Sequence, residues 1–209
     1  MKHNQSGFTL IEIAIVLVII GLLLGGVLKG QELINSAKVK NLAGDFKNIP
    51  VYIYGYQDKF RALPGDDAAA ITHVTATANG DGDGLIEGGW PAATESLNFW
   101  QHVRLAQLAP GPTDTAAADY IPKNAVGGNV GVTSAADSPI TNLRGSYVVC
   151  SKSIAGKFAK QLDVTLDDSN TATGSLQVTA DTATTAAKLG ATATASINDD
   201  TPYLVCMGF

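Results

Sequence analysis

The sequence has few of the residues from which most catalytic and metal sites are built. Its 209 residues include three histidines and two cysteines, and charged residues make up only 16%. It contains no G-x-S-x-G, no phosphate-binding P-loop and no H-E-x-x-H. His3 lies in a short polar leader, and His73 and His102 are isolated in the chain. An enzyme is therefore not expected.

Positive charge is also scarce. The formal net charge is −5 and the isoelectric point is near 5.0, so the chain lacks the basic footprint of a nucleic-acid-binding protein. No specific nucleic-acid partner is indicated. Soluble proteins average about a quarter charged residues, so the polar surface here is expected to come from Thr, Ser, Asn and Gly.

One feature stands out against this background, a long apolar run over residues 8–28. About 20 apolar residues suffice for a helix to cross a hydrocarbon core of about 30 Å, so this stretch predicts a membrane-spanning helix. Lys2 in the leader favours the cytoplasmic side for this end. Glu12 is the exception within the run, and a carboxylate at that depth costs at least a few kcal/mol unless it is paired or functional.

The segment Gly7-Phe8-Thr-Leu-Ile-Glu12 resembles the class III signal of type IV pilins and of type II secretion pseudopilins. The resemblance extends through the apolar helix. It implies cleavage between Gly7 and Phe8 by prepilin peptidase, usually with N-methylation of the new amine on Phe8. It also implies that an inner-membrane assembly platform packs the helices of many copies into a filament core.

Glu12 fits that implied role. Once Gly7 is removed, the amine of Phe8 is positive, and a carboxylate four residues on can neutralise it in the same or a neighbouring subunit. Desolvation limits the net energy of such a pair, so its main expected value is to set the register of an incoming subunit. The alternative is a stray acid in an ordinary signal anchor.

Four glycines within and just after the apolar run allow two interpretations. Gly21 and Gly25, and likewise Gly26 and Gly30, have the small-residue spacing that lets membrane helices approach closely. Each glycine also weakens a helix by about 1 kcal/mol relative to Ala, so the segment is equally a candidate for local melting on assembly. Many relatives in the pilin family carry a proline where this chain has Lys29.

Residues 29–60 are expected to continue the helix in amphipathic form, because apolar residues recur at alternating spacings of four and three. They are Leu42, Phe46, Ile49, Ile53, Tyr56 and Phe60. The predicted fold class is α+β, with this long helix packed on a small antiparallel sheet as in type IV pilins. The expected boundaries are a leader at 1–7, a membrane and filament-core helix at 8–28, its continuation at 29–60 and a globular head at 61–209.

Pro64-Gly65 should end the helix, and Asp66 or Asp67 could cap a following turn. A similar Leu-Pro-Gly-Asp, followed by an acidic glycine loop and an aromatic helix, occurs in a subset of pilin-like proteins. Here the loop spans residues 79–87, and the helix is expected at 95–108.

The acidic loop is the main metal candidate in the sequence. Asp81, Asp83 and Glu87 could supply oxygen ligands to Ca²⁺, with Gly84 permitting a sharp turn. Asn79 and Trp90 depart from the EF-hand pattern, and an Asn-Gly and Asp-Gly surface turn is the alternative.

The second half of the chain is expected to be mostly loop and strand. Residues 110–142 are interpreted as a long loop, 147–150, 175–179 and 203–206 as strands, 154–166 as a helix, and 182–196 as a low-complexity loop. Three acids at the end of that helix are interpreted as helix termination and solvation, with a second cation site as the alternative. They are Asp163, Asp167 and Asp168.

Cys150 and Cys206 favour a disulfide, because an even cysteine count is typical of exported chains. Their separation corresponds to about 4 kcal/mol in the loop-entropy model. The resemblance implies a carboxy-terminal disulfide that bounds a surface loop. A metal or redox pair is the weaker alternative, since there is no C-x-x-C.

The predicted function is a structural subunit of a type IV pilus, assembled with copies of itself through its amino-terminal helix. The precursor is expected in the inner membrane and the product in an extracellular pilus. One alternative is a type II secretion pseudopilin or minor pilin, in a periplasmic pseudopilus. Another is a monomeric, membrane-anchored binding domain.

Overall fold

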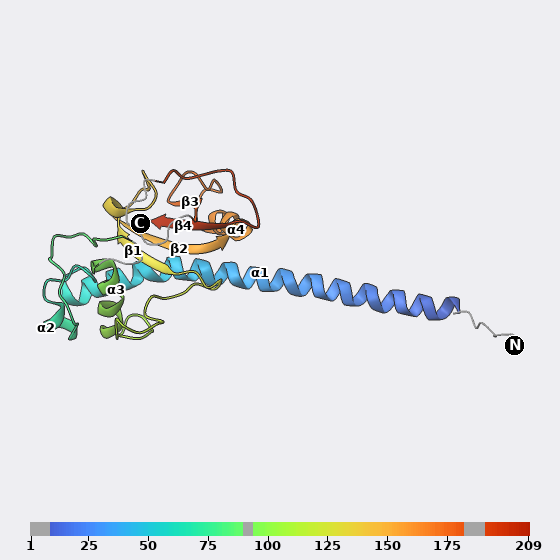
Figure 1. Ribbon diagram of the computed structural model, residues 1–209, viewed down its shortest axis with the longest axis horizontal. Coiled ribbons are helices and arrows are strands. Elements are labelled where there is room, and N and C mark those ends of the chain that lie inside the picture. Colours follow the sequence, from blue (N-terminus) through green and yellow to red (C-terminus); the bar gives the residue numbers. More distant parts are fainter. Residues whose placement is uncertain (1–8, 90–93, 182–190) are drawn as a thin grey trace. The chain divides into compact units, whose positions relative to one another are not determined.

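The computed structural model describes residues 9–89, 94–181 and 191–209, and the chain divides into two compact units at Lys38/Val39. Gly7 and Phe8 lie outside the described residues. Figure 1 shows the elements in chain order, which are α1 (Leu10–Phe60), α2 (Ala70–Val74), α3 (Thr94–Leu105), β1 (Val130–Ser134), η1 (Ala135–Asp137), β2 (Tyr147–Ala155), α4 (Gly156–Leu166), β3 (Leu176–Ala180) and β4 (Pro202–Gly208).

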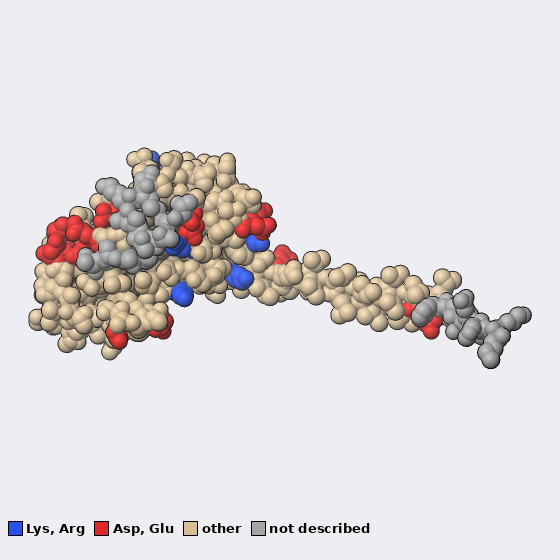
Figure 2. Space-filling view, in the orientation of Figure 1, with Lys and Arg blue, Asp and Glu red and all other residues tan. Residues whose placement is uncertain are grey.

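The first unit contains the amino-terminal part of α1. By length and composition, α1 includes one stretch that could cross a membrane, and none of that stretch is buried. Its large apolar side chains, from Leu10 to Leu28, are exposed. On the face seen in Figure 2, this segment is largely uncharged. Such a surface is stable only in lipid or against other apolar surfaces.

The second unit begins with the part of α1 that is amphipathic. Val39, Leu42, Phe46, Ile49 and Ile53 are buried at helical spacing and form a core with apolar side chains of the sheet. The predicted α+β fold, a long apolar helix packed on a small antiparallel sheet as in type IV pilins, is therefore confirmed.

The sheet has four antiparallel strands in the order β1-β2-β4-β3. Successive side chains of a strand face opposite sides, and both sides are buried here. Val149 and Val205 belong to the core shared with α1, whereas Val148 and Leu204 pack on the other side with Ile140. α4 adds Phe158, Ala159 and Leu162 to the α1 core.

The structure corrects the predicted limits of several elements. The predicted loop at 110–142 contains β1, which is stabilised by pairing with β2 rather than by a strong local pattern. β2 extends to Ala155, with a register shift between Ser151 and Ile154, so α4 starts at Gly156 instead of Ile154. α3 ends at Leu105 rather than Leu108. These errors have a common cause. Cross-strand partners and turns set where these strands and helices begin and end, and local sequence patterns do not show them.

Candidate functional site

The amino-terminal end of α1 is capped by a capping box formed by Thr9 and Glu12. The backbone N–H and the hydroxyl of Thr9 each donate a 2.8 Å hydrogen bond to Oε2 of Glu12. In return, the N–H of Glu12 donates to Oγ1 of Thr9 at 3.3 Å. This reciprocal pair satisfies backbone donors that a helix leaves open at its first turn.

The capping box gives Glu12 a role inside one chain besides the predicted role between chains. A carboxylate in the first turn is also favoured by the positive end of the helix dipole. The Thr-x-x-Glu spacing is a recognisable helix-start signal in the sequence, whereas the predicted role of Glu12 depends on its charge alone. The predicted pairing of Glu12 with the amine of Phe8 stays a prediction, because Phe8 lies outside the described residues.

The four glycines within and just after the apolar run are all helical within α1. A Cβ placed on Gly21, Gly25, Gly26 or Gly30 would meet nothing within 4 Å. The described part of a single chain therefore gives no steric reason for glycine at these positions. Both predicted roles, close helix approach between subunits and local melting on assembly, stay predictions.

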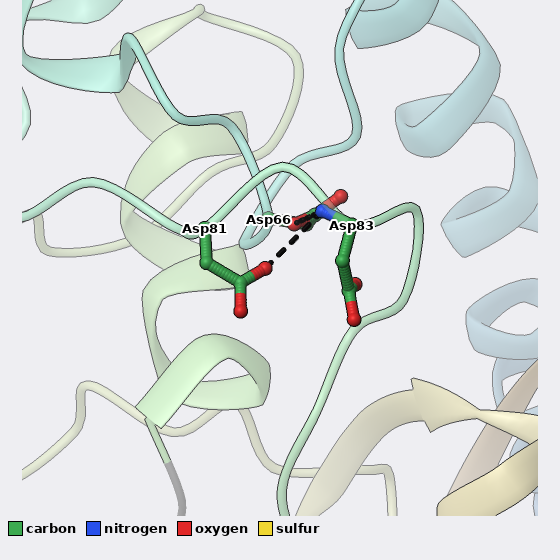
Figure 3. A group of neighbouring side chains, drawn as sticks. All are labelled: Asp66, Asp81 and Asp83. Carbon is green, nitrogen blue, oxygen red and sulfur yellow. Dashed lines mark hydrogen bonds between the residues drawn. The ribbon is translucent and has the colours of Figure 1, made fainter.

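The acidic loop brings together two of the three predicted calcium ligands. One oxygen each of Asp66, Asp81 and Asp83 lie within 4.8 Å of one another. Figure 3 shows Asp81 and Asp83 on a turn beside Asp66, with the N–H of Asp83 donating to both other carboxylates. Asp66 was predicted only as one of two possible caps, with Asp67, of the turn after the long helix. Glu87 is not part of this group.

Glu87 is separated from the acidic group by the direction of the chain after Gly84. The neighbouring Ile86 exchanges hydrogen bonds with Ser134 of β1, so this part of the loop runs against the strand edge. The negative charge of Asp83 is the main cause that raises the pKa of the Glu87 carboxyl. Desolvation and other nearby acids add to this effect. Calcium binding by Asp81, Asp83 and Glu87 stays a prediction.

Two buried carboxylates hold the acidic loop in place. Oδ1 of Asp66 accepts hydrogen bonds from the N–H groups of Gly82 and Asp83 at 2.6 and 3.1 Å, and Oδ2 accepts from Gly84 at 2.9 Å. Glu95 of α3 accepts from Asp81 at 3.1 Å and from Glu87 at 3.0 Å. Burial raises the pKa of both Asp66 and Glu95, although these N–H donors oppose the shift.

The two histidines of the second unit have structural partners. Nδ1 of His102 accepts a 2.9 Å hydrogen bond from the N–H of Gly65, and burial lowers the pKa of this imidazole. His73 lies 2.7 Å from Oδ2 of Asp67, a residue that also bonds Tyr56. Each imidazole thus has a partner in the turn that follows α1, Gly65 for His102 and Asp67 for His73.

The two cysteines form the predicted disulfide, Cys150–Cys206. They are register partners on the neighbouring strands β2 and β4. The segment between them contains α4 and β3 as well as loops. The disulfide therefore closes a substructure of the sheet rather than a surface loop alone.

One comparison with known proteins gives a match, and it covers the amino-terminal segment. Residues 2–28 match the family described as the prokaryotic N-terminal methylation motif, which is the class III signal of type IV pilins and pseudopilins. No curated protein sequence and no solved structure matches the chain. The match confirms the resemblance of the amino-terminal segment.

The motif and the α+β layout together support a type IV pilin or pseudopilin, and they point to a structural protein rather than an enzyme. The motif implies processing by prepilin peptidase and assembly into a pilus or pseudopilus. It also fits membrane insertion as a precursor.

Proposed function

We propose that the chain is a structural subunit of a type IV pilus, cleaved at Gly7-Phe8, methylated on Phe8 and assembled with copies of itself on the cell surface. The observation that carries this proposal is the exposed apolar stretch of α1, which contains Glu12 as its only charged residue between Thr9 and Leu28. A filament core is one environment that buries such a surface.

In the proposed function, assembly transfers the apolar helix from lipid into a core formed by the same helix of other subunits. The change in polarity is small, because lipid tails and aliphatic side chains are similarly apolar, so packing and polar contacts decide helix association. The open space around Gly21, Gly25, Gly26 and Gly30 allows the backbone of a neighbouring helix to approach closely. An inner-membrane platform would supply the energy for extraction, since the sequence has no nucleotide-binding motif.

Register between subunits is assigned to Glu12. Both Thr9 bonds reach Oε2, and a carboxylate oxygen has lone pairs for more than one donor. The carboxylate can therefore cap its own helix and receive the amine of Phe8 from a neighbour. An incoming chain bound in the wrong register would leave the Glu12 carboxylate without a positive partner, at a cost of several kcal/mol.

The test separates capping from charge. Gln also completes a capping box, so Glu12→Gln should keep the helix start while losing the charge pairing. Filaments sheared from cells expressing each variant are examined by electron microscopy and mass spectrometry. Wild type should give filaments of a protein that starts at Phe8, and Glu12→Gln and Glu12→Val should both give at least tenfold fewer.

Glu32→Gln is the matched control, because Glu32 is also an exposed acid of α1 but is paired with Lys29 at 2.7 Å. It should assemble like wild type. Normal filaments from Glu12→Gln would contradict the register role and leave capping as the function of Glu12.

A type II secretion pseudopilin or minor pilin is the second candidate, because the methylation motif is common to these proteins. It would be supported if processed protein stays in the envelope while surface filaments lack it. An uncleaved protein that remains monomeric whatever residue 12 is would instead support a membrane-anchored binding domain.

A further inference from the structure

Three acids gather where α4 ends. Asp163 lies in the last turn of α4, and Asp167 and Asp168 follow directly after it. One carboxylate oxygen from each lies within 4.8 Å of the other two. Ligands on opposite sides of a calcium ion, each at 2.3–2.6 Å, are about 5 Å apart, so the spacing suits a shared cation.

Asp163 is the member of this group that has no explanation within the protein. The residue is 1% exposed, and neither carboxylate oxygen has a hydrogen-bond partner among the residues that the structure describes. Leaving a buried polar group unpaired is costly, and a buried charge more so. Asp66 in the acidic loop is buried to a similar degree but accepts three N–H bonds.

The local electrostatics make a cation more favourable still. The carboxyl end of a helix carries the negative end of its dipole, where acids are disfavoured and cations favoured. The lysines of α4 are engaged elsewhere, Lys157 with Asp200 and Lys160 with Asp199.

The other two acids are held in position by the turn that follows. Asp168 accepts hydrogen bonds from the N–H of Asn170 at 2.9 Å and from the hydroxyl of Thr173 at 2.7 Å. Asp167 accepts from the N–H of Leu176 at 2.7 Å. Gly174 has a φ of +77°, and a Cβ there would collide with the Asp167 carboxylate. The turn thus fixes two carboxylates beside the third.

We propose that Asp163, Asp167 and Asp168 form a Ca²⁺ site at the end of α4. Three carboxylates are hard oxygen ligands, and the hydrogen bonds to Asp167 and Asp168 leave lone pairs on their oxygens. Water and nearby backbone carbonyl groups can complete the six to eight ligands that calcium takes. This inference does not depend on the filament role.

Calcium binding is measured by equilibrium dialysis of radioactive Ca²⁺ against the full chain in detergent micelles, after treatment with a chelator. The variants are Asp163→Asn, Asp168→Asn and the double change Asp81→Asn/Asp83→Asn. The double variant removes two acids of the acidic loop and leaves the three acids at the end of α4, so it shows which group binds calcium. Asp163→Asn and Asp168→Asn should each weaken one binding site at least tenfold, and that site should persist in the double variant.

Thermal unfolding of the same proteins gives a second readout. Calcium should raise the midpoint of wild type and of the double variant, because a ligand of the native state stabilises it, and it should not do so in Asp163→Asn. Asp168 is exposed, so Asp168→Asn keeps the test valid if Asp163→Asn fails to fold. The proposal is overturned if wild type binds no calcium at millimolar concentration, or if both single variants keep wild-type affinity.

Discussion

The hydroxyl of Tyr56 donates a 2.7 Å hydrogen bond to Oδ2 of Asp67, which ties α1 to the turn that follows it. Both residues are buried. Tyr56→Phe should lower the free energy of unfolding by about 1.5–3 kcal/mol, because a hydrogen bond to a buried charge is lost without a replacement. Urea unfolding of the full chain in micelles measures this. Tyr54→Phe is the control, since Tyr54 is 57% exposed, and an equal loss there would contradict the prediction.

Asp45 should make the protein more stable in mild acid. Burial raises the pKa of the Asp45 carboxyl from its ordinary value of 3.8 to about 6. The folded state therefore binds the Asp45 proton more tightly than the unfolded state does. The stabilisation that this gives the folded state is fully present below about pH 4 and is lost as pH rises through about 6. Asp45→Asn should raise the free energy of unfolding at pH 7 by about 1–2 kcal/mol, allowing for solvent screening.

Urea unfolding at pH 5 and pH 7 checks the Asp45 prediction. The difference between Asp45→Asn and wild type should be larger at pH 7 than at pH 5. Asp58→Asn, which removes an exposed acid of the same helix, is the control for the loss of one negative charge. A constant difference at the two pH values would argue against a raised pKa.

Reducing the Cys150–Cys206 disulfide should lower the free energy of unfolding by about 4 kcal/mol, because the bond closes a loop with a sequence separation of 56. Cys150→Ser/Cys206→Ser should have the same effect. Unfolding with and without a reducing agent measures it. The chain has only these two cysteines, so the double serine variant should not respond to the reductant, and a response would point to another cause.

Asp66→Ala should loosen the acidic loop. It removes the acceptor of the Gly82, Asp83 and Gly84 N–H groups and should cost about 1–3 kcal/mol. Hydrogen exchange measured by mass spectrometry should show faster exchange over residues 80–85. Asp114→Ala is the control, because Asp114 is exposed and its carboxylate accepts a hydrogen bond from the N–H of Ala116. Unchanged exchange in Asp66→Ala would mean that the loop is held by other contacts.

The long helix and its buried face could be predicted from the sequence because both depend on local patterns. The apolar run and the spacing of Leu42, Phe46, Ile49 and Ile53 repeat with the period of a helix, which holds whatever the rest of the chain does. The disulfide could be predicted because an even cysteine count in a chain expected to be exported favours one. β1 was missed because Val-Gly-Val-Thr-Ser is short and is stabilised by β2.

The candidate sites were predictable only in part, for a related reason. Asp81 and Asp83 are close in sequence, so their proximity in space was expected, whereas Asp66 joins them across a turn that local spacing does not reveal. The acids at the end of α4 were visible as a cluster. That Asp163 is buried without a partner depends on how α4 packs, which no local pattern encodes.

The bond between β2 and β4 also has a mechanical consequence. Each residue of an extended chain adds about 3.5 Å. Cys150 and Cys206 are separated by 56 residues, so the disulfide prevents about 200 Å of chain from being extended by a pulling force. A chain pulled from its two ends would transmit force directly from β2 to the final strand. α4, β3 and the carboxylates of Asp163, Asp167 and Asp168 would then lie off the line of force.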